Sequence, residues 1–137
     1  MEKSLPTHAV KAVIKNAQGE VLFLQRAGQS RADGKTNWDL PGGLVEPGED
    51  DDAALAREVD EELHTKAAVR QEIGKWTFFR PYDDQTVEVT NYEVTIGVSD
   101  ASQLMLSHEH TAAKFFNQES LRELDVKDPS IFAALGI

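Results

Sequence analysis

The sequence predicts an α+β domain in which helices pack on a mixed β-sheet. Several β-rich segments are interrupted by one strongly amphipathic helical segment near the middle of the chain, and shorter helical segments follow near its end. The 137 residues suit one domain with one hydrophobic core, and no repeat or low-complexity segment divides them. We therefore expect residues 1–137 to form a single domain.

Two strands and a loop are predicted for the first quarter of the chain. Residues 8–15 and 21–25 are β-rich, and the turn residues at 16–20 indicate that the two strands form a hairpin. The polar residues 27–37 include two glycines and are typical of a loop.

The amphipathic helix follows a short strand and a glycine pair. Residues 38–40 predict a strand that stops at Pro41, Gly42 and Gly43, and residues 51–63 carry apolar side chains at helical spacing. The remaining segments predict long strands at 65–80 and 86–98 around a turn at 81–85, a short strand at 114–116, and short helices at 118–124 and 129–135.

The composition limits the partners and the chemistry of the protein. A formal net charge of −10, from 24 acidic and 14 basic residues, repels long nucleic acids, whose binding depends on basic side chains. A small phosphorylated substrate remains compatible with this charge, because divalent cations can join carboxylates to phosphates. The absence of cysteine excludes disulfides, zinc–thiolate sites and thiol catalysis.

The chain carries no sign of a membrane or secreted protein. No apolar run approaches the length of a membrane span, and the polar residues 1–5 precede no apolar stretch of a secretory signal. We therefore expect a cytoplasmic protein with no membrane partner.

Three glutamates stand together on the predicted helix. A helical wheel that advances about 100° per residue places Glu58, Glu61 and Glu62 on one face. The adjoining stripe is apolar and consists of Leu55, Val59 and Leu63. Like charges at this spacing disfavour a helix, and a hard cation such as Mg²⁺ would remove that cost by binding carboxylate oxygens. The alternative interpretation of the helix alone is a solvated acidic face.

The residues around the helix carry a known signature. From Gly43 the chain runs through five residues to Glu49, then through seven residues to Arg57–Glu58, and ends with the pair Glu61–Glu62. This spacing resembles the Nudix box of the Nudix hydrolase superfamily, and the preceding residues 38–42 resemble the family's approach to the box. The resemblance implies the Nudix fold, an α/β/α sandwich with a mixed β-sheet.

The resemblance also implies a reaction and a cofactor. Members of this family use Mg²⁺, with Mn²⁺ as an alternative, to direct water onto a phosphorus of a diphosphate in a nucleotide-like substrate. The implied metal ligands are the Gly42 carbonyl and the carboxylates of Glu58, Glu61 and Glu62. Glu61 and Glu62 are the candidate proton acceptors within the box, and the sequence leaves the choice between them open.

Arg57 is expected to act together with Glu49. The wheel directs Arg57 away from the metal-binding face, and the resemblance implies that it pairs with Glu49 to hold the loop against the helix. Both residues are therefore counted with the catalytic machinery, as residues that position it.

The chain departs from the family pattern at the end of the box. Glycine is usual where His64 stands, and an aliphatic residue is usual where Thr65 stands. Position 64 follows the last apolar residue of the helix, where a left-handed conformation is common, and histidine tolerates a positive φ better than most residues do. We expect a modest loss of stability and no loss of chemistry.

Candidate substrate contacts lie outside the box. Arg26 ends a predicted strand, and Arg31 and Lys35 lie in the following loop, where they could bind phosphates or stay solvated. Tyr82 lies at a turn and could stack on a base. The other aromatic residues of this region, Trp76, Phe78 and Phe79, are expected in the core.

A histidine pair flanks one more candidate. His108 and His110 would share one side of a strand, but the sequence offers no evident third ligand for a zinc site. Glu109 resembles the loop glutamate with which many Nudix hydrolases complete the metal shell or activate water. The alternative is a surface acid with no function.

Four functions are candidates for this sequence. A nucleotide pyrophosphohydrolase is favoured, and an ADP-ribose pyrophosphatase is the alternative because Pro81 lies sixteen residues past Thr65, as in that class. An isopentenyl diphosphate isomerase of the same fold would need a cysteine. A non-catalytic nucleotide-binding module would be expected to have lost box glutamates, all of which are present. The sequence is also compatible with a homodimer.

Overall fold

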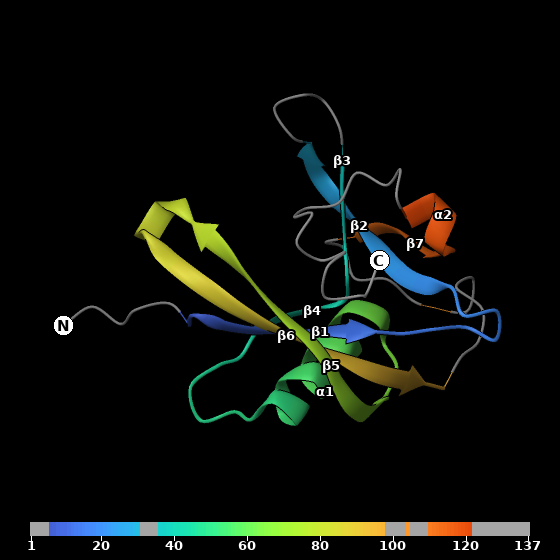
Figure 1. The fold of residues 1–137 in the computed structure, drawn as a ribbon, viewed down its shortest axis with the longest axis horizontal. Helices are drawn as coiled ribbons and strands as arrows, with labels where there is room; N and C mark the ends of the chain where they lie inside the picture. The colour runs from blue at the N-terminus through green and yellow to red at the C-terminus, as the bar shows by residue number, and fades with distance from the viewer. Residues whose placement is uncertain (1–5, 31–35, 98–103, 105–109, 122–137) are drawn as a thin grey trace.

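The computed structural model describes residues 6–30, 36–97, 104 and 110–121. Its strands form two sheets (Figure 1). The first has the order β4 (Gly42–Leu44), β1 (His8–Val13), β6 (Gln85–Ile96), β5 (Ala67–Arg80), and the second the order β3 (Thr36–Asp39), β2 (Val21–Ser30), β7 (His110–Phe116). The pair β1–β6 is parallel and the other pairs are antiparallel, so the predicted mixed sheet is confirmed.

The predicted hairpin of the first two strands is wrong beyond its turn. The turn itself exists, with the Asn16 N–H donating to the Glu20 carbonyl at 3.0 Å, but β1 and β2 meet only at a bridge between Lys15 and Val21. A strand has two hydrogen-bonding edges, and β4 and β6 occupy both edges of β1. Strand β2 therefore diverges into the second sheet.

Of the loop predicted for residues 27–37, the described residues 27–30 and 36–37 are strand, so the prediction is wrong there. Strand β2 continues to Ser30 and β3 begins at Thr36, and these two residues are partners in the second sheet. The glycine pair that was expected to stop a strand instead forms β4, where Gly42 and Gly43 pair with Lys11 and Val10. Both segments are strands because they pair with a neighbouring strand, and local composition does not indicate such pairing.

Helix α1 (Asp51–Leu63) has the predicted bounds and clear local causes. The Asp50 carboxylate caps its N-terminus by accepting from the Ala53 N–H at 2.8 Å. His64 caps the C-terminus at φ 52° and ψ 45°, so the predicted left-handed conformation is confirmed. The helix buries an apolar stripe on one face of the first sheet, formed by Ala54, Leu55, Val59 and Leu63 against Val10, Ala12 and Ile14.

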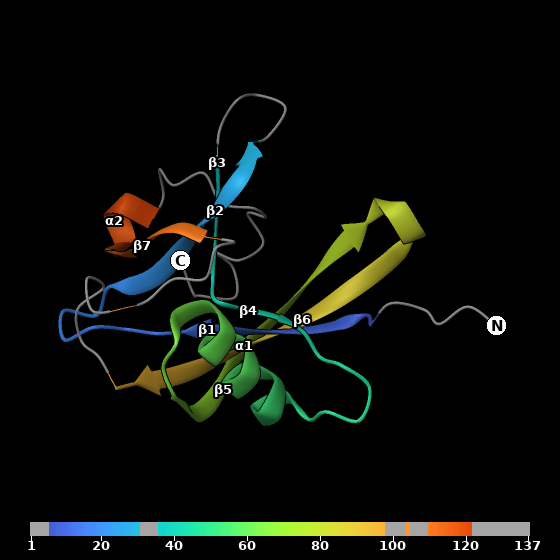
Figure 2. The ribbon, with the colours of Figure 1, turned by 180° about the vertical axis from the view of Figure 1, so that it is seen from behind.

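A second core fills the space between the two sheets on the side away from α1. It joins the first sheet to β2, β7 and the short helix α2 (Gln118–Leu121), through Val13, Val21, Phe23, Leu40, Phe116 and Leu121. Helix α1 and helix α2 thus lie on opposite sides of the strands (Figure 2). This is the predicted sandwich. The predicted helix 118–124 is described only as far as Leu121, and the predicted helix 129–135 lies outside the described residues.

Strands β5 and β6 form a long hairpin whose tip is the 3₁₀ turn η1 (Pro81–Asp83). Figures 1 and 2 show this tip projecting away from α1. Trp76 and Phe78 pack partly against the core, as expected, but Phe79 is 56% exposed, which corrects its placement in the core. Successive strand residues face opposite sides, so Phe79 cannot share the packed face of Phe78. Among the described helices, none is long and apolar enough to cross a membrane.

Candidate active site

The three glutamates of α1 face different surroundings. Glu62 is buried, and its Oε1 accepts a hydrogen bond from the Gly42 N–H of β4 at 2.7 Å. Glu58 is half-buried beside Gly43, whereas the Glu61 side chain is 58% exposed. The helix and β4 therefore bring two carboxylates against the glycine pair and leave the third open to solvent.

The glycine pair makes this close approach possible. Gly42 has a φ of +140°, and a Cβ at this position would lie 2.1 Å from the Val10 carbonyl oxygen. A Cβ at Gly43 would lie 2.6 Å from Oε1 of Glu58. Any larger residue would push β4 away from β1 or from the glutamate, so both glycines are needed for the geometry of the site.

Arg57 joins the loop before the helix to the acidic face. Its guanidinium contacts Glu49 at two points, with Nε 2.8 Å from Oε2 and Nη2 2.9 Å from Oε1. The pairing implied by the resemblance is therefore present. The expectation that Arg57 points away from the glutamates is wrong in part, because Nη1 lies 2.9 Å from Oε1 of Glu58 and 3.5 Å from Oε1 of Glu61. An arginine is long enough to reach both neighbours.

Electrostatics separates Glu49 from the helix glutamates. Hydrogen bonds from Arg57 and from the Glu46 N–H lower the pKa of Glu49 to about 2, so it is a permanent anion. Burial raises the pKa of Glu62 to about 8, although Lys11 and the Gly42 N–H oppose this shift. Burial also raises the pKa of Glu58, against the effect of Arg57. The two inner carboxylates are thus unfavourable as anions in the metal-free protein.

A buried lysine that was not predicted from the sequence adds a positive charge beside the inner glutamates. The Lys11 side chain on β1 is 12% exposed, and its Nζ donates to Asp39 Oδ2 at 3.0 Å and to the Leu40 carbonyl at 3.3 Å. Burial lowers the pKa of this ammonium, but the carboxylates of Asp39, Glu62 and Glu58 raise it further, so Lys11 stays charged. The only sequence signal was a lysine placed between apolar residues of a strand.

The donor set suits a hard cation. Glu58, Glu61, Glu62 and the Gly42 carbonyl offer only oxygen, which is the ligand type that Mg²⁺ prefers. Carboxylates that are buried and costly as anions would gain most from such a charge. Within the described ranges, no three acidic, histidine or cysteine side chains already form a metal-binding group. Arg57 instead donates to Glu58, and the Gly42 N–H donates to Glu62.

Of the other candidate residues, the structure describes the side chain of Tyr82 alone, and Tyr82 is not brought to this site. Tyr82 lies on η1, 72% exposed and stacked 5.4 Å from the Arg80 guanidinium, at the tip that projects away from α1. Arg26 lies on β2 opposite His110 of β7, and the placement of its side chain is not described. Arg31, Lys35, His108 and Glu109 lie outside the described residues.

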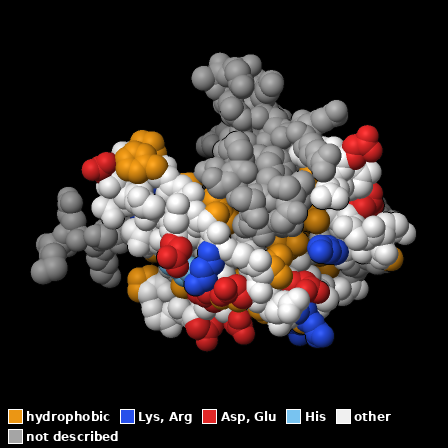
Figure 3. Space-filling model, viewed as in Figure 1, with side chains coloured by type: hydrophobic (Ala, Val, Ile, Leu, Met, Phe, Trp, Pro, Cys, Tyr) orange, Lys and Arg blue, Asp and Glu red, His pale blue; other side chains and the backbone are white. Residues whose placement is uncertain are grey.

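Figure 3 shows acidic side chains gathered over the lower half of the face seen in that view, with Lys and Arg side chains among them.

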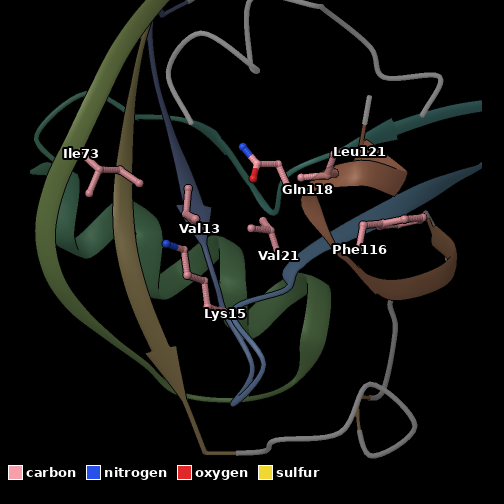
Figure 4. A pocket seen from close by; sticks show the side chains of 8 residues that line it. Val13, Lys15, Val21, Ile73, Phe116, Gln118 and Leu121 are labelled. Atoms are coloured by element: carbon pink, nitrogen blue, oxygen red, sulfur yellow. The ribbon is translucent and has the colours of Figure 1, made fainter. Parts of the chain in front are cut away.

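A cavity of about 230 Å³ opens between β1, β5 and α2 (Figure 4). Its lining includes Val13, Lys15, Ile73 and Gln118 and none of the predicted site residues.

Comparisons with known proteins agree on one family. A sequence model of the NUDIX domain matches residues 5–135. An uncharacterised Nudix hydrolase from Pseudomonas aeruginosa is 33% identical over 119 residues, which are 86% of this chain and 67% of the relative. A CTP pyrophosphohydrolase from Escherichia coli is 31% identical over 110 residues, 80% of this chain and 76% of the relative.

Solved structures share the fold. A NUDIX hydrolase from Nitrosomonas europaea superposes with a TM-score of 0.77 at 20% identity, covering 96% of this chain and 87% of the other. A MutT protein from Methanosarcina mazei superposes with a TM-score of 0.74 at 28% identity, covering 98% of this chain and 94% of the other.

Proposed function

The chain belongs to the Nudix hydrolase family, and from that premise we propose that it catalyses the Mg²⁺-dependent hydrolysis of a diphosphate linkage in a nucleoside di- or triphosphate derivative. One observation supports this most directly. Two carboxylates of α1, Glu58 and Glu62, lie against the Gly42–Gly43 strand with burial that raises the pKa of both. A site that is costly without a cation is suited to bind one.

The proposed metal ligands are Glu58, Glu61, Glu62 and the Gly42 carbonyl. A bound Mg²⁺, or Mn²⁺ in its place, neutralises phosphate oxygens and lowers the pKa of an attacking water. The protein's own groups set the geometry. The Gly42 N–H orients Glu62, and Arg57 fixes Glu58 and the loop through Glu49. Glu61 and Glu62 are the candidate proton acceptors, and Glu61 is the more open to water.

Glu109 remains a further candidate for the metal shell or for activation of water. Replacement by glutamine separates these roles. A large loss of kcat at saturating Mg²⁺ would support a general base, which contributes roughly 10²–10⁴ in rate, whereas rescue by added Mg²⁺ would support a ligand. Wild-type kcat and Mg²⁺ dependence would remove Glu109 from the proposal.

A nucleoside triphosphate is the favoured substrate class. The relative named CTP pyrophosphohydrolase is 31% identical over four-fifths of this chain, and it supports a nucleotide substrate here. ADP-ribose is the alternative class to test. The similar ADP-ribose pyrophosphatase structure from Streptococcus suis is only 18% identical, so it supports the fold and not the substrate.

Turnover of a substrate panel by glutamate variants tests the proposal. We expect Mg²⁺-dependent phosphate or pyrophosphate release from a nucleoside triphosphate, and Glu58→Gln, Glu61→Gln and Glu62→Gln should each lower turnover by about 100-fold or more. Asp60→Asn is the matched control, because Asp60 is an exposed acid on the same helix. Wild-type turnover in the Glu58 and Glu62 variants would contradict the metal assignment. Hydrolysis of ADP-ribose alone would instead support the alternative substrate.

A further inference from the structure

One row of residues crosses the first sheet, starting at the proposed active site. Gly42 of β4 is the register partner of Lys11 on β1, and Lys11 is the partner of Asn91 on β6. Gly74 on β5 is the next partner of Asn91. Neighbouring strands lie about 4.8 Å apart, so Asn91 is about 10 Å from Gly42 along this row. The row leads from the glycine that bonds Glu62 to the middle of the sheet.

Asn91 carries a buried hydrogen-bond donor for which the described part of the chain provides no acceptor. Its side chain is fully buried, and its Oδ1 accepts from the Trp76 indole N–H at 3.0 Å. An indole nitrogen can only donate, so the amide oxygen must face Trp76 and the amide nitrogen must face elsewhere. That nitrogen, Nδ2, has no hydrogen-bond partner among the residues that the structure describes. Native proteins rarely leave such a group unpaired, which suggests a partner that is absent from the free protein.

The surroundings of Asn91 fit a ligand that extends from the metal site. Registered partners on neighbouring strands share one face, so Lys11 and Asn91 lie on the same side of the sheet, opposite the side that packs on α1. Asp39 and Leu40 engage two of the three N–H donors of Lys11. Gly74, beyond Asn91, has no side chain, and a glycine inside a strand often marks the close approach of another group.

We infer that Asn91 is a specificity-determining residue that donates through Nδ2 to a keto oxygen of the substrate's base. The inference rests on the proposed function, because it needs a nucleotide whose diphosphate lies at the glutamates. A base that carries a keto group presents an oxygen with two lone pairs to the paired N–H groups of Nδ2. Adenine has no keto group. Its acceptors are ring nitrogens with one lone pair each, and the exocyclic amine beside N1 and N7 would meet the amide donor with another donor. We therefore expect the site to prefer a keto base over adenine.

Binding of non-hydrolysable nucleotides tests this assignment. The probes are the α,β-methylene analogues of GTP, UTP, CTP and ATP, with methylenediphosphonate as the base-free probe, titrated calorimetrically with Mg²⁺. We expect the wild type to bind at least one keto-base analogue about tenfold more tightly than the ATP analogue. In Asn91→Asp the donor becomes an acceptor, so this preference should disappear while affinity for the base-free probe is unchanged.

Two further variants guard the result against misfolding and general charge effects. Trp76→Phe removes the donor that fixes the amide, so the amide can turn over and the base preference should narrow even if Asn91→Asp fails to fold. Gln85→Glu, the matched amide-to-acid change at an exposed position of β6, should keep the wild-type preference. A wild type with no base preference would overturn the inference. So would an equal loss of affinity for the base-free probe in Asn91→Asp.

The proposed function can fail separately. Wild-type protein that binds methylenediphosphonate and hydrolyses nucleotides without regard to the base retains that function and overturns only the role of Asn91. Wild-type protein that binds none of the probes, the base-free one included, overturns both.

Discussion

The Arg57 guanidinium donates two hydrogen bonds to the Glu49 carboxylate, with lengths of 2.8 Å and 2.9 Å. The same side chain reaches the Leu44 carbonyl at 3.2 Å and Glu58 at 2.9 Å. One arginine thus joins the loop that precedes α1 to the acidic face. The two-point contact fixes an angle as well as a distance, so a change in the loop is transmitted to Glu58.

Arg57 and Glu49 should therefore behave as one unit. Arg57→Ala and Glu49→Gln should each lower kcat/KM, and the double variant should lose little more than the worse single variant. A double-mutant cycle in kcat/KM should give a coupling free energy of about 0.5–3 kcal/mol. Glu46→Gln is the control, because the hydrogen bonds between Glu46 and Glu49 use only backbone groups of Glu46. Losses that simply add would show that the pair is not coupled.

The metal-free protein should become less stable as the pH rises. The pKa of Glu62 is about 8 in the folded protein and about 4.3 in an unfolded chain, so the folded state holds a proton that the unfolded state releases between these values. The free energy of unfolding in EDTA should be highest below about pH 4.3 as far as Glu62 is concerned, and its contribution should be lost as the pH approaches 8. Urea melts across this interval measure the slope.

Glu62→Gln identifies the group responsible. The amide does not titrate, so this variant should lose most of the pH dependence and should be more stable than the wild type near pH 8 in EDTA. Asp60→Asn, an exposed acid on the same helix, should keep the wild-type slope. An unchanged slope in Glu62→Gln would mean that another group titrates.

Much of the site could be predicted because its causes are local. The helix bounds follow from apolar spacing and from Asp50, whose carboxylate caps the residue three positions ahead. The left-handed His64 follows from its place after the last apolar residue. The Arg57–Glu49 contact joins residues only eight positions apart. Residues that are close in the chain are then also close in the fold.

The features that escaped prediction depend on distant partners. β1 could not be separated from β2 without knowing that β4 and β6 take both of its edges. The short glycine strand β4 exists because β1 lies beside it. The burial of Lys11 requires Asp39, twenty-eight positions away and in the other sheet. A single sequence indicates none of these pairings.

His64 offers a test of backbone strain. His64→Gly should raise the free energy of unfolding by about 1 kcal/mol, because glycine adopts a positive φ without the clash of a Cβ. Asp84→Gly is a matched comparison, since Asp84 has a φ of 56° at the hairpin tip. Both changes should raise the melting temperature and leave kcat/KM unchanged. A lower melting temperature for His64→Gly would show that the imidazole contributes more than the strain costs.

Lys11 should affect stability and metal binding in opposite directions. Lys11→Met keeps the length of the side chain but leaves the Asp39 carboxylate, 22% exposed, without its ammonium partner. We expect a loss of about 2 kcal/mol in the free energy of unfolding in EDTA, which is typical of a half-buried polar group that loses its partner. The same change removes a positive charge that acts on Glu58 and Glu62. Mg²⁺ should then bind more tightly, and the Mg²⁺ concentration for half-maximal turnover should fall.

Lys15→Met replaces an exposed lysine on the same face and near the end of the same strand, and it should change neither quantity. Weaker Mg²⁺ binding in Lys11→Met would mean that the lysine acts by holding the Asp39–Gly42 turn in place, and that its charge is secondary.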